Sequence, residues 1–144
     1  MAPINEDIET KVRNSFAAQS MMTTLGAELK NVELGKVTIS APVLDGLRQQ
    51  HDFAHAGLIF SIGDSAAGYA ALSVMPIEAE VLTVEMKINL IAPAPANSML
   101  IAEGRVLKPG RRLVVVASDV WSQNPGGKPI QVAALQGTMI PVNS

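Results

Sequence analysis

Residues 56–75 read AGLIFSIGDSAAGYAALSVM. This stretch is apolar on all sides apart from Asp64, and eleven of its twenty residues are Ala, Gly or Ser. Its length raises the possibility of a transmembrane helix, but a central acid and so many small side chains make a poor lipid-facing span. We therefore expect a buried helix in a soluble domain, covered on most sides by other elements.

The segments around this stretch predict one further helix and a sheet. Ile8, Val12 and Phe16 recur at four-residue steps behind a candidate N-cap, Asn5, which predicts a helix over about 5–20. Apolar and polar residues alternate in the later segments, which is typical of strands packed on one face. The short turns between them favour antiparallel pairing, with Pro109-Gly110 closing a hairpin. The expected strands are 33–43, 80–91, 99–107, 113–121 and 129–141.

These elements predict an α+β fold in which a curved, five-stranded antiparallel sheet wraps around the helix at 56–75. Small side chains on that helix would let the strands approach its backbone closely. No linker interrupts the chain, so we expect a single domain, 1–144, with an N-terminal helical extension over 1–24. Such a sheet keeps exposed edges, which predicts pairing with a second subunit.

Composition excludes several classes of function. A formal net charge of −2 and five aromatic residues offer neither a basic field nor a stacking platform for nucleic acid. The absence of cysteine excludes disulfides, thiol nucleophiles and thiolate metal sites, and two histidines cannot complete a metal centre alone. We expect no metal and no cofactor. Acidic residues near the start of the chain argue against a secretory signal, so we expect a cytoplasmic protein without membrane association.

The residues that carry chemistry lie just before the central helix, where residues 49–57 read QQHDFAHAG. Ala56 and Gly57 have almost no side chain to cover the unpaired backbone N–H groups of a helix N-terminus. Such a terminus can hold a developing negative charge, and the amide of Gln49 or Gln50 could assist. The segment therefore predicts an oxyanion site for a thioester or ester carbonyl.

Asp64 is the second candidate, a lone acid within the apolar helix. It stands about 12 Å along the helix axis from Ala56, because each residue adds 1.5 Å. If the helix N-terminus of one chain faces the middle of its partner's helix, the two features meet across a two-fold axis. Burial should raise the pKa of this carboxyl. The competing interpretation is that Asp64 only caps a helix that starts there.

Three stretches together resemble a known family. They are residues 49–57, residues 64–71 (DSAAGYAA) and residues 82–94 (LTVEMKINLIAPA). The chain from about residue 20 onward resembles the phenylacetate-degradation (PaaI-like) branch of the hotdog-fold acyl-CoA thioesterases. The resemblance implies a central helix in an antiparallel sheet and a homodimer, commonly assembled into a homotetramer.

The resemblance also implies roles for individual residues. In the family a His-Gly-Gly turn opens the helix and a carboxylate follows; His55, Ala56, Gly57 and Asp64 stand at these places. Asp64 would be general base or nucleophile, the Ala56 N–H would polarise the carbonyl, and His55 would steady the turn or the departing thiolate. Gln49 replaces a common Asn, and Ala56 replaces the first glycine and so excludes the positive φ that glycine allows.

Two further contacts complete the predicted site, one implied by the resemblance and one by the residues themselves. Thr83 stands where the family has a hydroxyl that assists the water. Lys108, Arg111 and Arg112, at or beside the predicted hairpin tip, form either an exposed turn or a contact for the phosphates of coenzyme A. The sequence thus predicts hydrolysis of acyl-CoA thioesters. A non-catalytic acyl-CoA or small-ligand binding module is the alternative, and a hydratase is disfavoured because the helix lacks the histidine that such enzymes use.

Overall fold

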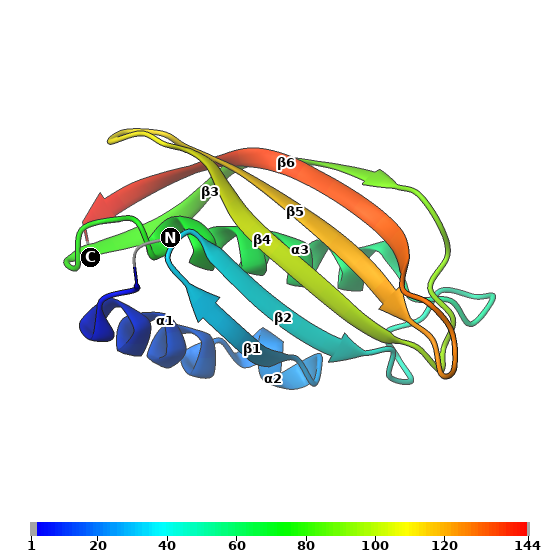
Figure 1. Cartoon of the computed structure of the whole chain (residues 1–144). Coiled ribbons are helices and arrows are strands. Elements are labelled where there is room, and N and C mark those ends of the chain that lie inside the picture. Colours follow the sequence, from blue (N-terminus) through cyan, green and yellow to red (C-terminus); the bar gives the residue numbers. More distant parts are fainter. Residues whose placement is uncertain (1–2, 144) are drawn as a thin grey trace.

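The computed structural model describes residues 3–143 and has one antiparallel sheet curved around one long helix, α3 (Figure 1). The strand order in the sheet is β1-β2-β4-β5-β6-β3, so β1 and β3 are its edges. The elements are α1 (Glu6–Ala18), α2 (Ser20–Thr24), β1 (Glu28–Glu33), β2 (Lys36–Pro42), α3 (Ala56–Leu72), β3 (Ala79–Leu90), β4 (Met99–Pro109), β5 (Val114–Gln123) and β6 (Ile130–Asn143). The predicted α+β architecture and the β4–β5 hairpin are confirmed.

The sheet has six strands, so the predicted count of five was wrong. The additional strand is β1. It is not recognisable from the sequence, because the strand has only two apolar residues, Leu29 and Val32. A register shift between Leu29 and Asn31 puts Leu29 opposite Ile39 and Val32 opposite Val37. Both apolar residues therefore face the core although they are three positions apart, and a bulge of this kind removes the alternation by which a strand is recognised.

The N-terminal helix is shorter than predicted. Asn5 caps α1, because its Oδ1 accepts from the backbone N–H of Asp7 at 2.8 Å, as expected. The helix ends at Ala18 rather than near residue 20, since Gln19 has an extended backbone (ψ 97°) before the short α2 begins. This break frees the Gln19 side chain to turn toward α3.

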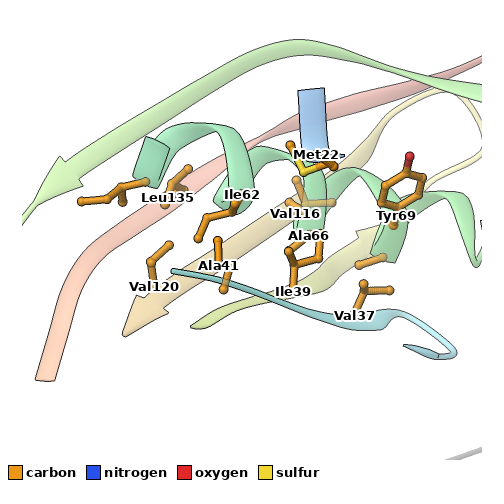
Figure 2. Packing of buried hydrophobic residues seen from close by; sticks show 14 of the residues in the cluster. Met22, Val37, Ile39, Ala41, Ile62, Ala66, Tyr69, Val116, Val120 and Leu135 are labelled. Carbon is orange, nitrogen blue, oxygen red and sulfur yellow. The ribbon is translucent and has the colours of Figure 1, made fainter. Parts of the chain in front are cut away.

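The core lies between α3 and the inner face of the sheet, and small residues set the distance between them. Figure 2 shows Ile62 and Ala66 of α3 among side chains of several strands. A Cβ on Gly63 would lie 2.9 Å from Leu135 Cδ2, and one on Gly104 would lie 2.2 Å from the Ala66 carbonyl carbon. Glycine at these two positions is therefore what allows the close approach of helix and sheet that the composition predicted.

Strand β3 contains a bulge that corrects a second expectation. Regular alternation over the expected strand 80–91 would put the apolar even-numbered residues, from Leu82 to Leu90, together on the core face. The register instead shifts between Thr83 and Glu85, so Thr83 lies opposite the buried Met139 and Met86 lies opposite Gly137. Thr83 and Met86 thus share the inner face, three positions apart. The bulge turns the Thr83 hydroxyl toward α3.

The outer edge of β3 is free and carries apolar side chains. Leu82, Val84 and Leu90 are each 55% exposed, and no other described strand pairs with this edge. A long, apolar edge strand of this kind is a template for pairing with another chain.

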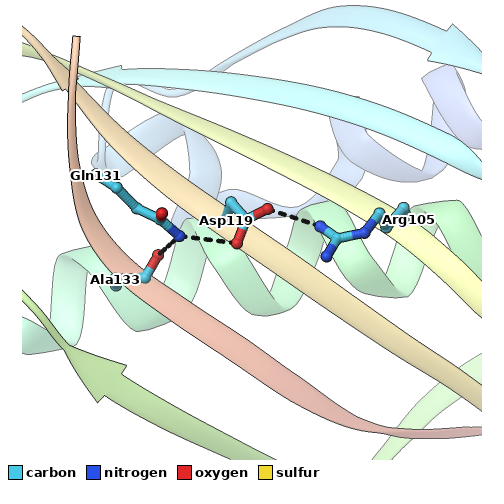
Figure 3. Close-up of polar contacts among 4 residues, drawn as sticks. All are labelled: Arg105, Asp119, Gln131 and Ala133. Carbon is cyan, nitrogen blue, oxygen red and sulfur yellow. Dashed lines mark hydrogen bonds and ion pairs between the residues drawn. The ribbon is translucent and has the colours of Figure 1, made fainter.

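The outer face of the sheet is polar where β4, β5 and β6 run side by side. Arg105 on β4 forms an ion pair of 2.7 Å with Asp119 on β5, and Gln131 on β6 donates to the same carboxylate at 2.9 Å (Figure 3). In residues 3–143, no helix has the length and apolar character that crossing a membrane requires.

Candidate active site

Asp64 lies in the middle of α3, eight residues after the helix begins at Ala56. The competing interpretation, in which Asp64 caps a helix that starts there, is therefore wrong. The residue is half-buried, with Ile62, Gly63 and Ala66 buried beside it. Burial raises the pKa of the Asp64 carboxyl above its ordinary value, and a hydrogen bond from Thr83 offsets part of that rise.

The Thr83 hydroxyl donates to Asp64 Oδ1 at 2.9 Å from the inner face of β3. The same hydroxyl lies 3.2 Å from the sulfur of Met139 on β6. Asp64 and Thr83 open into a cleft of about 250 Å³ between α3, β3 and the end of α1. A carboxylate held by one hydrogen bond and open to a cleft on its other side can contact a water molecule or a substrate carbonyl.

A group of hydrogen-bonded polar side chains from α1, α3 and the residue after α1 also lines this cleft. Gln19 Nε2 donates to the Tyr69 hydroxyl at 2.8 Å, and Ser65 donates to Gln19 Oε1 at 3.3 Å. The Ser15 hydroxyl lies 3.1 Å from the same Tyr69 oxygen. No local pattern in the sequence groups these residues, since Ser15 and Gln19 reach Tyr69 only because α1 packs near α3.

The N-terminus of α3 forms a second, separate feature. His55 is the N-cap, and its Nδ1 accepts from the Gly57 N–H at 2.8 Å. The imidazole therefore carries its proton on Nε2 when neutral. Within residues 3–143, the Ala56 N–H donates to no protein acceptor. Of the two N–H groups predicted for an oxyanion site, the one of Ala56 is available and the one of Gly57 is occupied by His55.

The loop before α3 is held by backbone hydrogen bonds that fix where this terminus points. The His55 N–H donates to the Leu47 carbonyl at 3.0 Å, and the Ala54 N–H donates to the Ala94 carbonyl at 2.9 Å. Gln49 belongs to this loop, and its Oε1 accepts from the His51 N–H. The Gln49 side chain thus braces its own turn, which leaves its amide N–H groups as the donors it could offer to a ligand.

Ala56 lines a cavity of its own, of about 290 Å³, together with Ile59, Leu90 and Pro93. This cavity shares no lining residue with the cleft beside Asp64. The structure therefore brings Asp64 and Thr83 together, and His55, Ala56 and Gly57 together, but it keeps the two groups about 12 Å apart along one helix.

The cationic residues predicted for coenzyme A lie at the β4–β5 hairpin. Lys108, Arg111 and Arg112 are all exposed, and none forms an ion pair with another described residue. Arg111 lines a cavity of about 430 Å³ with residues that follow the C-terminal end of α3, among them Met75 and Glu78. In residues 3–143, no three His, Asp or Glu side chains are grouped so that they could hold a metal ion.

Comparison with known proteins identifies the family. A model of the thioesterase superfamily matches residues 51–128, more than half of the chain, from the loop before α3 to beyond β5. The chain belongs to the thioesterase superfamily. Its general activity is therefore thioester hydrolysis, and the resemblance to PaaI-like hotdog thioesterases is confirmed.

Solved structures extend this similarity beyond the matched residues, over most of the chain. A thioesterase family protein from Silicibacter pomeroyi is 39% identical, with a TM-score of 0.91 over 95% of this chain and 99% of that one. The E. coli PaaI protein of the phenylacetic acid degradation operon has the same fold at 18% identity, with a TM-score of 0.87 over 98% and 97%. A Streptococcus mutans protein solved with acetyl CoA is 25% identical, with a TM-score of 0.70 over 82% and 90%.

Proposed function

We propose that this superfamily member hydrolyses acyl-CoA thioesters to a free acid and coenzyme A, with Asp64 as the group that activates water. The observation that carries the proposal is the hydrogen bond between Thr83 and Asp64 in an open cleft. A raised pKa makes the ionised carboxylate a stronger base than an ordinary aspartate, which favours proton abstraction from water. A Streptococcus relative bound to acetyl CoA supports a CoA thioester as the substrate class.

The reaction then proceeds by addition and elimination at the thioester carbonyl. Asp64 takes a proton from water while the water oxygen forms a bond to the carbonyl carbon. The carbon–sulfur bond breaks next, and the departing thiolate receives the proton from Asp64. If Asp64 instead attacks the carbonyl itself, the carbon–sulfur bond breaks and leaves a mixed anhydride and the CoA thiolate. Water then hydrolyses the anhydride to the free acid and the Asp64 carboxylate, and the thiolate takes up the remaining proton. Thr83 holds the carboxylate in one orientation in either route.

The negative charge on the carbonyl oxygen requires a donor, and the Ala56 N–H is the candidate. It stands at the positive end of the 17-residue α3 and faces no protein acceptor among the described residues. His55 takes the Gly57 N–H and so keeps the first turn of the helix in place. Loss of one positioned oxyanion donor costs about 10²- to 10³-fold in kcat in comparable sites.

Since one chain keeps Asp64 and Ala56 apart, we propose that the site forms between two subunits of a homodimer. The free edge of β3 is the proposed contact, because its exposed apolar side chains need cover. Thr83 lines the cleft beside Asp64, and Leu90 lines the cavity beside Ala56. Antiparallel pairing of two β3 strands brings the cleft of one subunit to the cavity of the other when the two-fold axis lies near Met86, midway between Thr83 and Leu90. Association of two such dimers into a homotetramer, with each chain one domain, completes the proposed assembly.

Lys108, Arg111 and Arg112 are proposed to contact the phosphates of coenzyme A, because they are exposed cations without an ion-pair partner in the described chain. Gln49 is proposed to offer its amide N–H groups at the Ala56 end of the site. No metal or cofactor enters the proposed reaction.

Thiol release from a panel of acyl-CoAs tests this function. We expect turnover by the wild type and a loss of about 10²- to 10⁴-fold in kcat for Asp64→Asn, which keeps the shape but not the base. Equal rates for the two proteins would remove Asp64 from the mechanism. Tight binding of acyl-CoA with no turnover for any chain length would instead indicate a binding module.

A further inference from the structure

The cleft beside Asp64 becomes polar on the side that faces α1, away from the helix N-terminus. We infer that this polar end selects short acyl groups that terminate in a hydroxyl or another neutral hydrogen-bonding group. The inference rests on the proposed acyl-CoA hydrolysis and assigns its substrate class. The side chains that form the polar end are Ser15, Gln19, Ser65, Tyr69 and Glu80.

Gln19 is held at this end by two hydrogen bonds. Its Nε2 donates to the Tyr69 hydroxyl at 2.8 Å, and its Oε1 accepts from Ser65 at 3.3 Å. The side chain reaches that place only because α1 ends one residue earlier, at Ala18. The amide is therefore fixed before any ligand arrives, which lowers the entropy cost of binding.

Gln19 retains unused hydrogen-bonding capacity. A glutamine amide has two N–H donors and two lone pairs on its oxygen, and the two bonds to Tyr69 and Ser65 use one of each. The residue is half-buried and lines the cleft. One N–H donor and one lone pair of Gln19 thus remain for a ligand. A hydroxyl can use both, because it accepts one hydrogen bond and donates another.

The distance from the reacting carbonyl limits the acyl group to a short chain. Tyr69 follows Asp64 by five residues, which is about 7.5 Å along the helix axis. Between them Gly68 has no side chain, and a Cβ placed there would meet only Met139 Cε at 3.8 Å. This leaves a groove over Gly68 along which an acyl chain can run from Asp64 to Gln19.

Charge and polarity at this end disfavour two other acyl classes. Glu80 lines the same cleft as Asp64, so an acyl group that ends in a carboxylate would meet two acids. An acyl group with an alkyl end would displace water from Gln19 and Tyr69 but could not replace the hydrogen bonds that the water makes. For this reason, a site that hydrogen-bonds a substrate hydroxyl discriminates against a substrate analogue without that hydroxyl.

The test compares kcat/KM for butyryl-CoA, its terminally hydroxylated analogue and succinyl-CoA. We expect the wild type to prefer the hydroxylated thioester about five- to tenfold over butyryl-CoA, the effect of one neutral hydrogen bond, mainly through KM. We expect Gln19→Leu and Tyr69→Phe to reduce this ratio toward one. The matched control is Gln136→Leu, the same substitution at an exposed β6 residue outside the Asp64 cleft, which should keep the wild-type ratio.

The outcomes separate the inference from the function on which it rests. Turnover of these thioesters with no preference for the hydroxyl, or with a ratio that Gln19→Leu leaves unchanged, overturns the inference and leaves the proposed hydrolysis standing. A preference for succinyl-CoA also overturns it. Failure of the wild type to hydrolyse any acyl-CoA overturns the proposed function and the inference together.

Discussion

The hydroxyl of Thr83 donates a hydrogen bond of 2.9 Å to Oδ1 of Asp64, across the space between β3 and α3. A bulge immediately after Thr83 makes this contact possible, because a regular strand would put Thr83 on the same side as Glu85, which lies on the outer face. An irregularity in the sheet thus serves the proposed chemistry.

Removing the Thr83 hydroxyl should change the dependence of kcat/KM on pH. In Thr83→Val the hydrogen bond that lowers the pKa of Asp64 is lost while burial still raises it, so the pKa rises further. Because the base must be ionised, we expect the acidic limb of kcat/KM to move to higher pH. Thr138→Val is the control, since that hydroxyl bonds the exposed Glu85 on the outer face. An unshifted limb in Thr83→Val would contradict the assigned contact.

The raised pKa of Asp64 also predicts a stability effect. A carboxyl whose pKa is higher in the folded state favours the protonated folded form, so its contribution to stability declines as pH rises from its unfolded pKa through its folded pKa. Asp64→Asn should remove this cost and raise the melting temperature at neutral pH by about 2–4 °C. The gain should disappear at a pH below both pKa values. A lower melting temperature at neutral pH would argue that the charge is well solvated.

The hairpin cations can be tested with two substrates that share one acyl group. The double variant Arg111→Ala, Arg112→Ala should raise KM for an acyl-CoA by about tenfold, because exposed cations contribute modestly to phosphate binding. For the same acyl group on a short pantetheine-like thiol without the nucleotide, KM should not change. An equal rise in KM for both thioesters would exclude a contact with the phosphates.

The edge of β3 can be tested by placing a charge on it. Val84 is more than half exposed at the bulge, and Val84→Asp should prevent pairing of two edges and abolish both dimer and activity. Ile130→Asp is the control, since Ile130 is similarly exposed at the start of β6 rather than on the free edge. Mass by light scattering gives the readout. A dimer that persists with full activity in Val84→Asp would place the interface elsewhere.

Much of this fold follows from local sequence patterns, and its departures have local physical causes. The small-residue helix, the hairpin and the Asn5 cap are visible because they depend on neighbours in the chain. The two-residue period did not predict β1 or the inward turn of Thr83, because each depends on a bulge that breaks that period. Thr83 was predicted as a site residue only through the family resemblance. Gln19 could not be found from sequence either, since its role depends on contact with Tyr69, fifty residues away.

In the proposed site, Asp64 of one subunit acts with the Ala56 N–H of the other. Ala56→Pro removes that N–H at the first position of α3, where proline is well accepted, and the extended backbone of His55 (ψ 143°) suits a following proline. Homodimers of Ala56→Pro and of Asp64→Asn should both be nearly inactive. A heterodimer of the two, isolated with two affinity tags, has one complete shared site.

We predict that this heterodimer regains about half of the wild-type kcat per dimer, since one of its two symmetry-related sites is intact. If each site were built within one chain, both sites of the heterodimer would carry a defect. A heterodimer as inactive as its parent homodimers would therefore exclude a site shared between two subunits.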